Sequence, residues 1–135
     1  MRASIALHVV AVLAREPARL HSSAELGVAV PASRSHLTGT LTRLVRAGVL
    51  ASVRGPRGGF RLAAPPARFT LRDVFEAAEG RVERPQRGRC GLGLGSACPF
   101  DRILRRVNDS LLEHLAATRL DGFAQEVGGA QPTGR

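Results

Sequence analysis

Residues 44–63 carry the sequence LVRAGVLASVRGPRGGFRLA, and its order of apolar runs and turn residues decides how the chain folds. The run Val49–Val53 predicts a strand, and Phe60–Ala63 predicts a second strand that returns beside it. Residues 54–59 between them are glycine, proline and arginine, which is typical of a turn. The stretch therefore predicts a β-hairpin whose tip carries arginine side chains.

Upstream of this hairpin, two helices are predicted by periodicity and by capping residues. Residues 3–15 carry apolar side chains at spacings of three and four, and Pro17 ends that segment. Ser22 and Glu25 then have the spacing of a capping box, in which each side chain satisfies a backbone donor at a helix start. A short second helix should begin there.

A third helix is predicted between the second helix and the hairpin. Pro31 breaks the chain, and Ser33 can cap a helix that runs to about residue 47. On or near its inward stripe should lie Leu37, Leu41, Leu44, Val45 and Gly48. Two short helices separated by a tight break form a helix-turn-helix pattern, and a hairpin directly after it suits the wing of a winged helix.

Polar side chains on the third helix and on the hairpin are candidates for nucleic-acid contact. On the helix they lie opposite or beside the apolar stripe, where they can reach base edges and phosphates: Ser33, Arg34, Ser35, His36, Thr38 and Thr42. For His36, packing is the alternative to a phosphate contact. On the wing, the candidates for backbone or minor-groove contact are Arg54, Arg57 and Arg61.

The positive charge is concentrated in the same half of the chain. Residues 1–72 hold eleven arginines against only Glu16 and Glu25, so they carry all of the formal net charge of +9. The remaining residues hold nine arginines and nine acids. The first half is therefore suited to a polyanion and the second half to protein.

After the wing, the pattern predicts a helix, a loop and a long helix. Thr70 and Asp73 form a second capping-box spacing that opens a helix through Glu79. A glycine-rich loop follows, and Pro99 suits the first turn of a long helix. Its apolar stripe includes the predicted dimerisation residues Ile103, Leu104, Val107, Leu111 and Leu115. The stripe is too apolar to stand alone, so we expect a symmetric partner to cover it.

These elements predict a mainly helical chain with a small β-hairpin wing, in which a long C-terminal dimerisation helix follows the winged helix-turn-helix. Residues 1–80 are predicted as the DNA-binding domain and 81–98 as a cysteine loop. Residues 99–127 are predicted as the dimerisation helix with a short terminal helix, and 128–135 as a flexible tail.

Composition excludes several other classes. Of 135 residues, 44% are hydrophobic, which argues against disorder, and no run is long and apolar enough to span a membrane. The N-terminus lacks the pattern of a signal peptide, and two cysteines are too few for a secreted disulfide framework. We therefore expect a soluble, cytoplasmic protein with no membrane partner and no small-molecule substrate. No Cys-x-x-Cys, nucleophile–base pair or nucleotide-binding glycine pattern suggests an enzyme.

The chain resembles the winged-helix regulators of the IscR and NsrR type, which are iron–sulfur or redox-sensing repressors. The resemblance is most specific over residues 44–50 and 53–63, and next over residues 70–80, which are similar to the helix that enters that family's cysteine loop. It implies a homodimer on a palindromic operator. The family commonly has three cysteines in this loop, whereas this chain has two, and Pro31 stands where a turn glycine is typical.

The resemblance also raises the question of what Cys90 and Cys98 do. A [2Fe–2S] cluster needs four donors, and family members complete theirs with a residue other than cysteine, in some cases from the first helix of the partner subunit. His8 lies on that helix, so Cys90, Cys98 and His8 form a candidate ligand set. Alternatively, His8 has a structural role, in which its ring packs against its neighbours and binds no metal. For the cysteines, the alternatives are a thiol–disulfide switch and inert thiols.

The sequence thus favours a sequence-specific transcriptional regulator, acting as a repressor, whose DNA affinity responds to a cluster or a thiol pair. Two alternatives from other classes remain. One is a thiol-redox protein, and the other is a winged helix that binds RNA or protein without sensing.

Overall fold

The computed structural model describes residues 2–81, 93–94 and 98–129. Three helices, α1 (Arg2–Arg15), α2 (Ser23–Ala29) and α3 (Arg34–Arg46), precede strands β1 (Leu50–Val53) and β2 (Gly59–Leu62). A 3-10 turn, η1 (Pro66–Arg68), leads to α4 (Leu71–Glu79). Helices α5 (Pro99–Ala117) and α6 (Leu120–Gly129) complete the described chain. The predicted fold class, mainly helical with a two-stranded wing, is confirmed.

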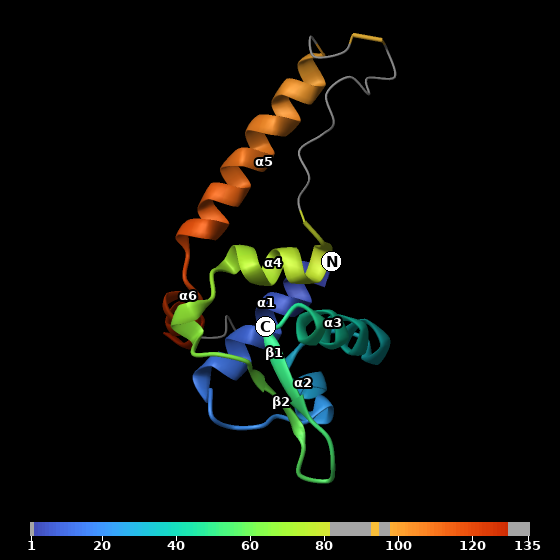
Figure 1. The fold of residues 1–135 in the computed structure, drawn as a ribbon, viewed down its shortest axis with the longest axis vertical. Coiled ribbons are helices and arrows are strands. Elements are labelled where there is room, and N and C mark those ends of the chain that lie inside the picture. Colours follow the sequence, from blue (N-terminus) through green and yellow to red (C-terminus); the bar gives the residue numbers. More distant parts are fainter. Residues whose placement is uncertain (1, 82–92, 95–97, 130–135) are drawn as a thin grey trace, which may run out of the picture.

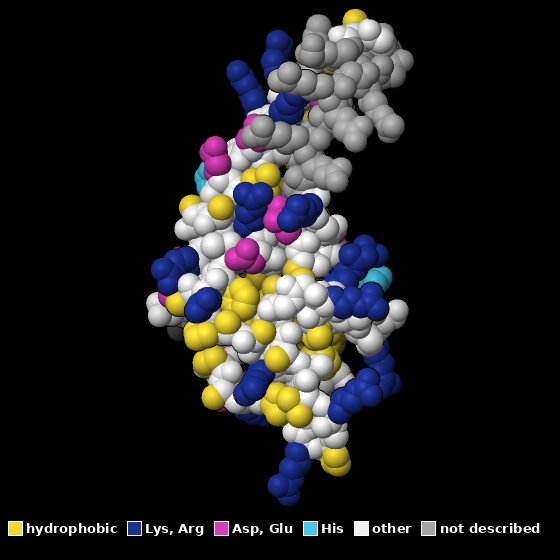
Figure 2. Space-filling view, viewed as in Figure 1, with side chains coloured by type: hydrophobic (Ala, Val, Ile, Leu, Met, Phe, Trp, Pro, Cys, Tyr) yellow, Lys and Arg dark blue, Asp and Glu magenta, His cyan; other side chains and the backbone are white. Residues whose placement is uncertain are grey.

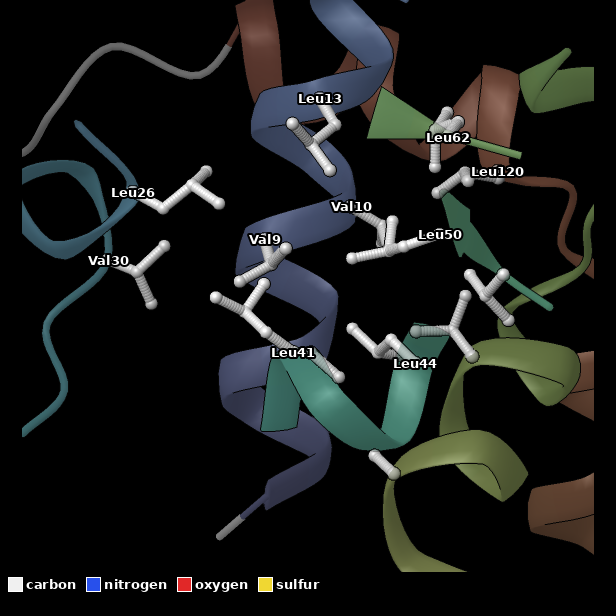
Figure 3. Packing of buried hydrophobic residues seen from close by; sticks show 14 of the residues in the cluster. Val9, Val10, Leu13, Leu26, Val30, Leu41, Leu44, Leu50, Leu62 and Leu120 are labelled. Carbon is white, nitrogen blue, oxygen red and sulfur yellow. The ribbon is translucent and has the colours of Figure 1, made fainter. Parts of the chain in front are cut away.

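The core forms around α1, which runs through the centre of the body. Figure 3 shows Val9, Val10 and Leu13 on this helix facing apolar side chains from α2, α3, both strands and α6. Leu13, Leu26, Leu44 and Leu120 are completely buried. The aliphatic core locks α3 and the wing onto one rigid support, which fixes their relative positions.

Helix boundaries follow the predicted caps. The Ser22 hydroxyl accepts a hydrogen bond from the backbone N–H of Glu25, and the Glu25 carboxylate accepts one from the backbone N–H of Ser22. Thr70 and Asp73 make the same reciprocal pair at the start of α4. Because these bonds satisfy donors that a helix start leaves open, they fix where each helix begins.

The hairpin has an additional partner that the sequence did not predict. Leu50 pairs with Leu62 at its base and Val53 with Gly59 near its tip, while the backbone of His21 exchanges two hydrogen bonds with Phe60 (2.9 and 2.8 Å). Gly59 has φ +151°, and a Cβ there would lie 2.5 Å from the His21 carbonyl oxygen. Only glycine therefore lets β2 approach the segment between α1 and α2 so closely.

Helix α5 extends away from the body, whereas α6 returns to pack beside α1 (Figure 1). The predicted terminal helix is present and continues to Gly129, two residues into the segment predicted as a tail. Gly128 and Gly129 thus continue α6. In the described part of the chain, no helix is long and apolar enough to cross a membrane.

Candidate nucleic-acid interface

The outer face of α3 presents polar side chains to solvent. Ser33 caps the helix, since its hydroxyl accepts a hydrogen bond from the backbone N–H of His36 (3.3 Å). All six residues predicted on this helix are exposed: Ser33, Arg34, Ser35, His36, Thr38 and Thr42. Leu37, Leu41 and Leu44 are buried on the opposite side. The helix is therefore anchored by one face and free to contact a ligand with the other.

Within this face, one threonine is held by the helix itself. The Thr42 hydroxyl donates to the Thr38 carbonyl oxygen (3.0 Å), which leaves its oxygen lone pairs available to accept. The Arg34 guanidinium makes no ion pair with any described residue. It begins the first turn of α3, so its long side chain can extend beyond the end of the helix.

The wing carries the three predicted arginines at exposed positions. Arg54 and Arg57 lie in the turn between the strands and Arg61 lies on β2, and none of the three makes an ion pair with a described residue. Figure 2 shows basic side chains projecting at the lower tip of the molecule, over the wing, and along its right edge, over α3. Helix and wing thus both present basic side chains on the same part of the molecule.

A cleft of about 600 Å³ lies between α3, the start of α2 and the wing. Its lining includes the predicted residues Thr42 and Arg54, and also Arg46 and Ser23, which the sequence analysis did not select. Arg46 follows Thr42 by one helical turn, so helical spacing from Thr42 could have identified it. No acidic side chain lines the cleft, which suits it to the phosphate backbone of a nucleic acid.

The two acids of the first 72 residues are both held by one arginine. Arg19 lies 3.0 Å from Glu16 and 2.5 Å from Glu25. The hydrogen bond to Glu16 and the charge of Glu25 raise the pKa of Arg19. Hydrogen bonds from Ser22 hold the pKa of Glu25 below its usual value, and Arg19 lowers it further. The carboxylates are therefore paired with Arg19 and make no ion pair with the arginines of α3 and the wing among the described residues.

Of the three candidate metal ligands, the structure describes His8 and Cys98, and these two do not lie together. Cys98 is buried at the start of α5, and Cys90 lies outside the described residues. His8 is exposed and lines a pocket with Leu111. Because Leu111 is thirteen residues beyond Cys98, the two candidate ligands are separated by about 20 Å along α5.

The local geometry of His8 is compatible with ligation but does not single it out. Its Nδ1 lies 2.6 Å from the Ser4 carbonyl oxygen, which leaves Nε2 as the free nitrogen. His114 makes the equivalent bond to Ser110. Among the described residues, no group of three His, Cys, Asp or Glu side chains could hold a metal ion. The described donors of a single chain thus do not fit a [2Fe–2S] cluster, and a shared site would need a second copy.

The predicted dimerisation residues lie on α5, and four of the five, all but Leu115, are exposed. Phe100 is 67% exposed, Val107 58% and Ile103 57%, and Leu104 and Leu111 are also exposed. Leu115 is half-buried against the core. No residue of α5 is fully buried.

A helix-turn-helix followed directly by a two-stranded wing with basic side chains defines the winged helix-turn-helix class of DNA-binding proteins. Within this class, the chain belongs to the Rrf2 family, described as iron-dependent transcriptional regulators, whose model matches residues 1–126. The predicted family of the IscR type is confirmed, and so is the prediction of a transcriptional regulator rather than an enzyme.

Individual relatives agree with this assignment. An HTH-type transcriptional regulator from Cereibacter sphaeroides, IscR, is 29% identical over 113 residues, which cover 84% of this chain and 73% of the relative. Two proteins of Neisseria meningitidis described as HTH-type regulators are each 32% identical over 95 residues, which cover 70% of this chain. That match spans 64% of each Neisseria protein, so the chain covers less than two thirds of their length.

Solved structures show the same fold. CymR, the global cysteine regulator of B. subtilis, superposes with a TM-score of 0.75 at 23% identity, covering 93% of this chain and 95% of that one. IscR of T. potens superposes with a TM-score of 0.73 at 21% identity, covering 97% of this chain and 90% of that one.

Proposed function

We propose that the chain binds a palindromic promoter element as a homodimer and represses transcription by occupying it. One observation carries the proposal: the exposed polar face of α3 and the exposed arginines of the wing flank one cleft that no acidic side chain lines. In such an arrangement, α3 enters the major groove while the wing contacts the backbone or the minor groove.

The residues divide by role. Arg34, Ser35 and Thr38 stand near the N-terminal end of α3, which is the end that reaches base edges in this class. Arg46 and Arg54 line the cleft between α3 and the wing, where their guanidinium groups can donate to a phosphate. Arg54, Arg57 and Arg61 supply charge that is independent of sequence.

Arg34→Ala tests this division of roles. If Arg34 donates to a guanine edge, the substitution weakens binding by about 1–3 kcal/mol and relaxes specificity at one operator position. Gel shifts with single-base operator variants measure both effects. Arg119→Ala is the matched control, since Arg119 is exposed and paired with Asp121 (3.6 Å) outside α3 and the wing. Equal weakening on every sequence would make Arg34 a phosphate contact.

RNA competition separates this proposal from its nearest alternative. A transcriptional regulator binds its palindrome more tightly than it binds bulk DNA or RNA. A winged helix that functions on RNA binds RNA as tightly as it binds DNA. The same competition run with and without oxidant shows whether binding depends on redox state.

We further propose that DNA affinity responds to the state of Cys90 and Cys98, through a cluster or through a thiol pair. The cysteine segment stands between the DNA-binding body and α5, so a bond formed there can bias their arrangement, typically by about 1–3 kcal/mol. Anaerobic purification separates the two chemistries. Visible absorption with about two irons per subunit supports a cluster, and a colourless, iron-free protein supports the thiol pair or inert thiols without sensing.

Substitutions refine that result. Cys90→Ala and Cys98→Ala should each remove the response to oxidant, nitric oxide or iron starvation. His8→Ala should alter the visible spectrum only if a cluster is bound, and should leave a thiol switch unchanged. If both cysteine variants still regulate transcription normally, the sensing proposal fails and the chain acts only as a DNA-binding module.

A further inference from the structure

The end of helix α4 is tied by hydrogen bonds to two other helices. The backbone N–H of Ala3, in the first turn of α1, donates to the Glu79 carboxylate (2.7 Å). The Arg43 guanidinium, in the last turn of α3, donates to the Ala78 carbonyl oxygen (3.4 Å). Figure 1 shows this end of α4 beside the N-terminus and next to α3. The last turn of α4 thus joins the central helix of the core to the helix that presents the polar face.

Both bonds satisfy groups that a helix leaves open at its ends. The first N–H groups and the last carbonyl groups of a helix have no partner within it. Ala78 is completely buried, so water has little access to its carbonyl oxygen. The charges also suit these ends, because a carboxylate is favourable at a helix start and a guanidinium at a helix end. Removing the Arg43 guanidinium therefore leaves a buried acceptor without this donor.

The position of Arg43 on α3 differs from that of its basic neighbour. Thr42 and Arg46 line the cleft beside the wing, whereas Arg43 does not line it and reaches α4 instead. The buried leucines of α3 hold the helix against the core, but apolar contacts have no preferred direction and tolerate a small rotation. A hydrogen bond is directional. The bond from Arg43 therefore constrains the rotation of α3 in a way that its apolar stripe does not.

We propose that Arg43 is a positioning residue for DNA recognition, which binds the end of α4 and thereby sets the rotation of α3. The inference rests on the proposed reading of DNA by α3 and specifies what holds that helix in place. Hydrogen bonds to base edges weaken steeply when their angles change, so a rotated helix loses discrimination at several operator positions together. Loss of a direct base contact, as proposed for Arg34, affects one position.

Arg43→Met tests this role, because it keeps the alkyl stem and removes the donor. The operator is recovered from random-sequence DNA with the wild type, and discrimination is the ratio of Kd for each single-base variant to Kd for that operator. Arg43→Met should lower this ratio by about 2- to 30-fold at several positions. The salt dependence of log Kd should stay unchanged. Arg43→Lys should restore the ratios, since an ammonium can also donate to a carbonyl at a helix end.

Two other arginines provide controls. Arg46→Met, in the cleft, should reduce the salt slope by about one unit and keep the ratios, as expected for a phosphate contact. Arg72→Met removes the partner of Glu76 on α4 and should change neither quantity. If Arg43→Met lowers the salt slope and keeps the ratios, Arg43 is a phosphate contact and the proposal is wrong. Equal weakening on every sequence, or no change at all, would also contradict it.

Amide hydrogen exchange tests the link between α4 and α3 without DNA. Gly80 ends α4 with φ +94°, where a side chain is strained, so Gly80→Ala disturbs this end of the helix. The Ala47 N–H, which donates to the Arg43 carbonyl oxygen (3.0 Å), should then exchange at least about twofold faster. The acceleration should be absent when Arg43→Met is also present. The Val30 N–H at the end of α2 is the control, and it should not respond.

The outcomes separate this inference from the proposed function. Equal acceleration of Ala47 with and without Arg43→Met would overturn the link between the two helices. A wild type that selects an operator, with ratios that Arg43→Met leaves unchanged, would overturn only the role of Arg43. A wild type that prefers no DNA sequence would contradict the proposed function and the role of Arg43 together.

Discussion

Helices α1 and α5 have similar sequence patterns and opposite surroundings. Both carry apolar side chains at spacings of three and four, yet α1 buries six of its fourteen residues and α5 buries none of its nineteen. Helix α1 is surrounded by α2, α3, α4, α6 and β2 of its own chain. Helix α5 extends past the end of the body (Figure 1).

The difference teaches that an amphipathic stripe specifies burial without specifying what covers it. For α1 the covering elements follow in the same chain, and the result is the rigid support for α3 and the wing. For α5 no described element covers Phe100, Ile103 or Val107, so under the proposed homodimer its stripe bears on assembly rather than on folding. Substitutions in α1 should therefore lower the stability of the fold, whereas substitutions in α5 should affect assembly.

The largest expected effect is in α1. Leu13→Ala removes a completely buried side chain and should lower the free energy of unfolding by about 2–5 kcal/mol. Urea denaturation measures the loss. Ile103→Ala on α5, where the side chain is 57% exposed, is the comparison, and at low protein concentration it should cost no more than about 0.5 kcal/mol. Equal costs at all concentrations would remove the distinction between the two helices.

A smaller loss is expected where the body holds the wing. Gly59→Ala places a Cβ against the His21 carbonyl oxygen, so the backbone of β2 has to shift, at a cost of about 1–3 kcal/mol. DNA affinity should fall along with stability, because the wing is displaced. Gly122→Ala, where a Cβ meets nothing within 4 Å, is the control. Unchanged affinity in Gly59→Ala would argue that the wing does not contact DNA.

Arginines of the body and of α5 should also differ in their effect on DNA binding. Arg57→Ala at the wing tip should weaken binding to all DNA sequences and reduce the salt dependence of log Kd by about one unit. Arg106→Ala on α5, at the other end of the molecule, should leave that slope unchanged. Titration of binding across salt concentrations checks both, and a shared slope change would indicate only a general effect of net charge.

The smallest expected effect concerns the capping box of α2. Because the folded chain lowers the pKa of Glu25, this carboxylate stabilises the fold above its unfolded pKa of about 4.3. That contribution is lost as the pH falls through the lowered value. Glu25→Gln keeps a capping amide but removes the charge, so its stability should vary less with pH below about 5. Urea titrations of both chains between neutral and acid pH measure the difference.

Features set by near neighbours in the sequence could be predicted. The Ser22–Glu25 and Thr70–Asp73 pairs act over three residues, so their spacing located the starts of α2 and α4. The polar face of α3 followed from its helical period in the same way. Arg46 also follows from that period, one turn beyond Thr42, although it is not among the residues predicted above.

Features that depend on distant packing could not be predicted. His21 joins Phe60 across thirty-nine residues of sequence, and no local pattern marks that contact. The sequence shows that His8 and Cys98 have side chains that can bind a metal. The distance between them depends on the direction in which α5 extends from the body. Nothing in the spacing of the two residues specifies that direction.

Selection of bound sites from random-sequence DNA tests the central claim most directly. If α3 and the wing read DNA as a two-fold dimer, the recovered sites should share an inverted repeat with half-sites about 10 base pairs apart, or a multiple of that spacing. Arg34→Ala should relax the same position in both halves. Recovery of sites with no shared sequence, or of a single unrepeated motif, would contradict the account.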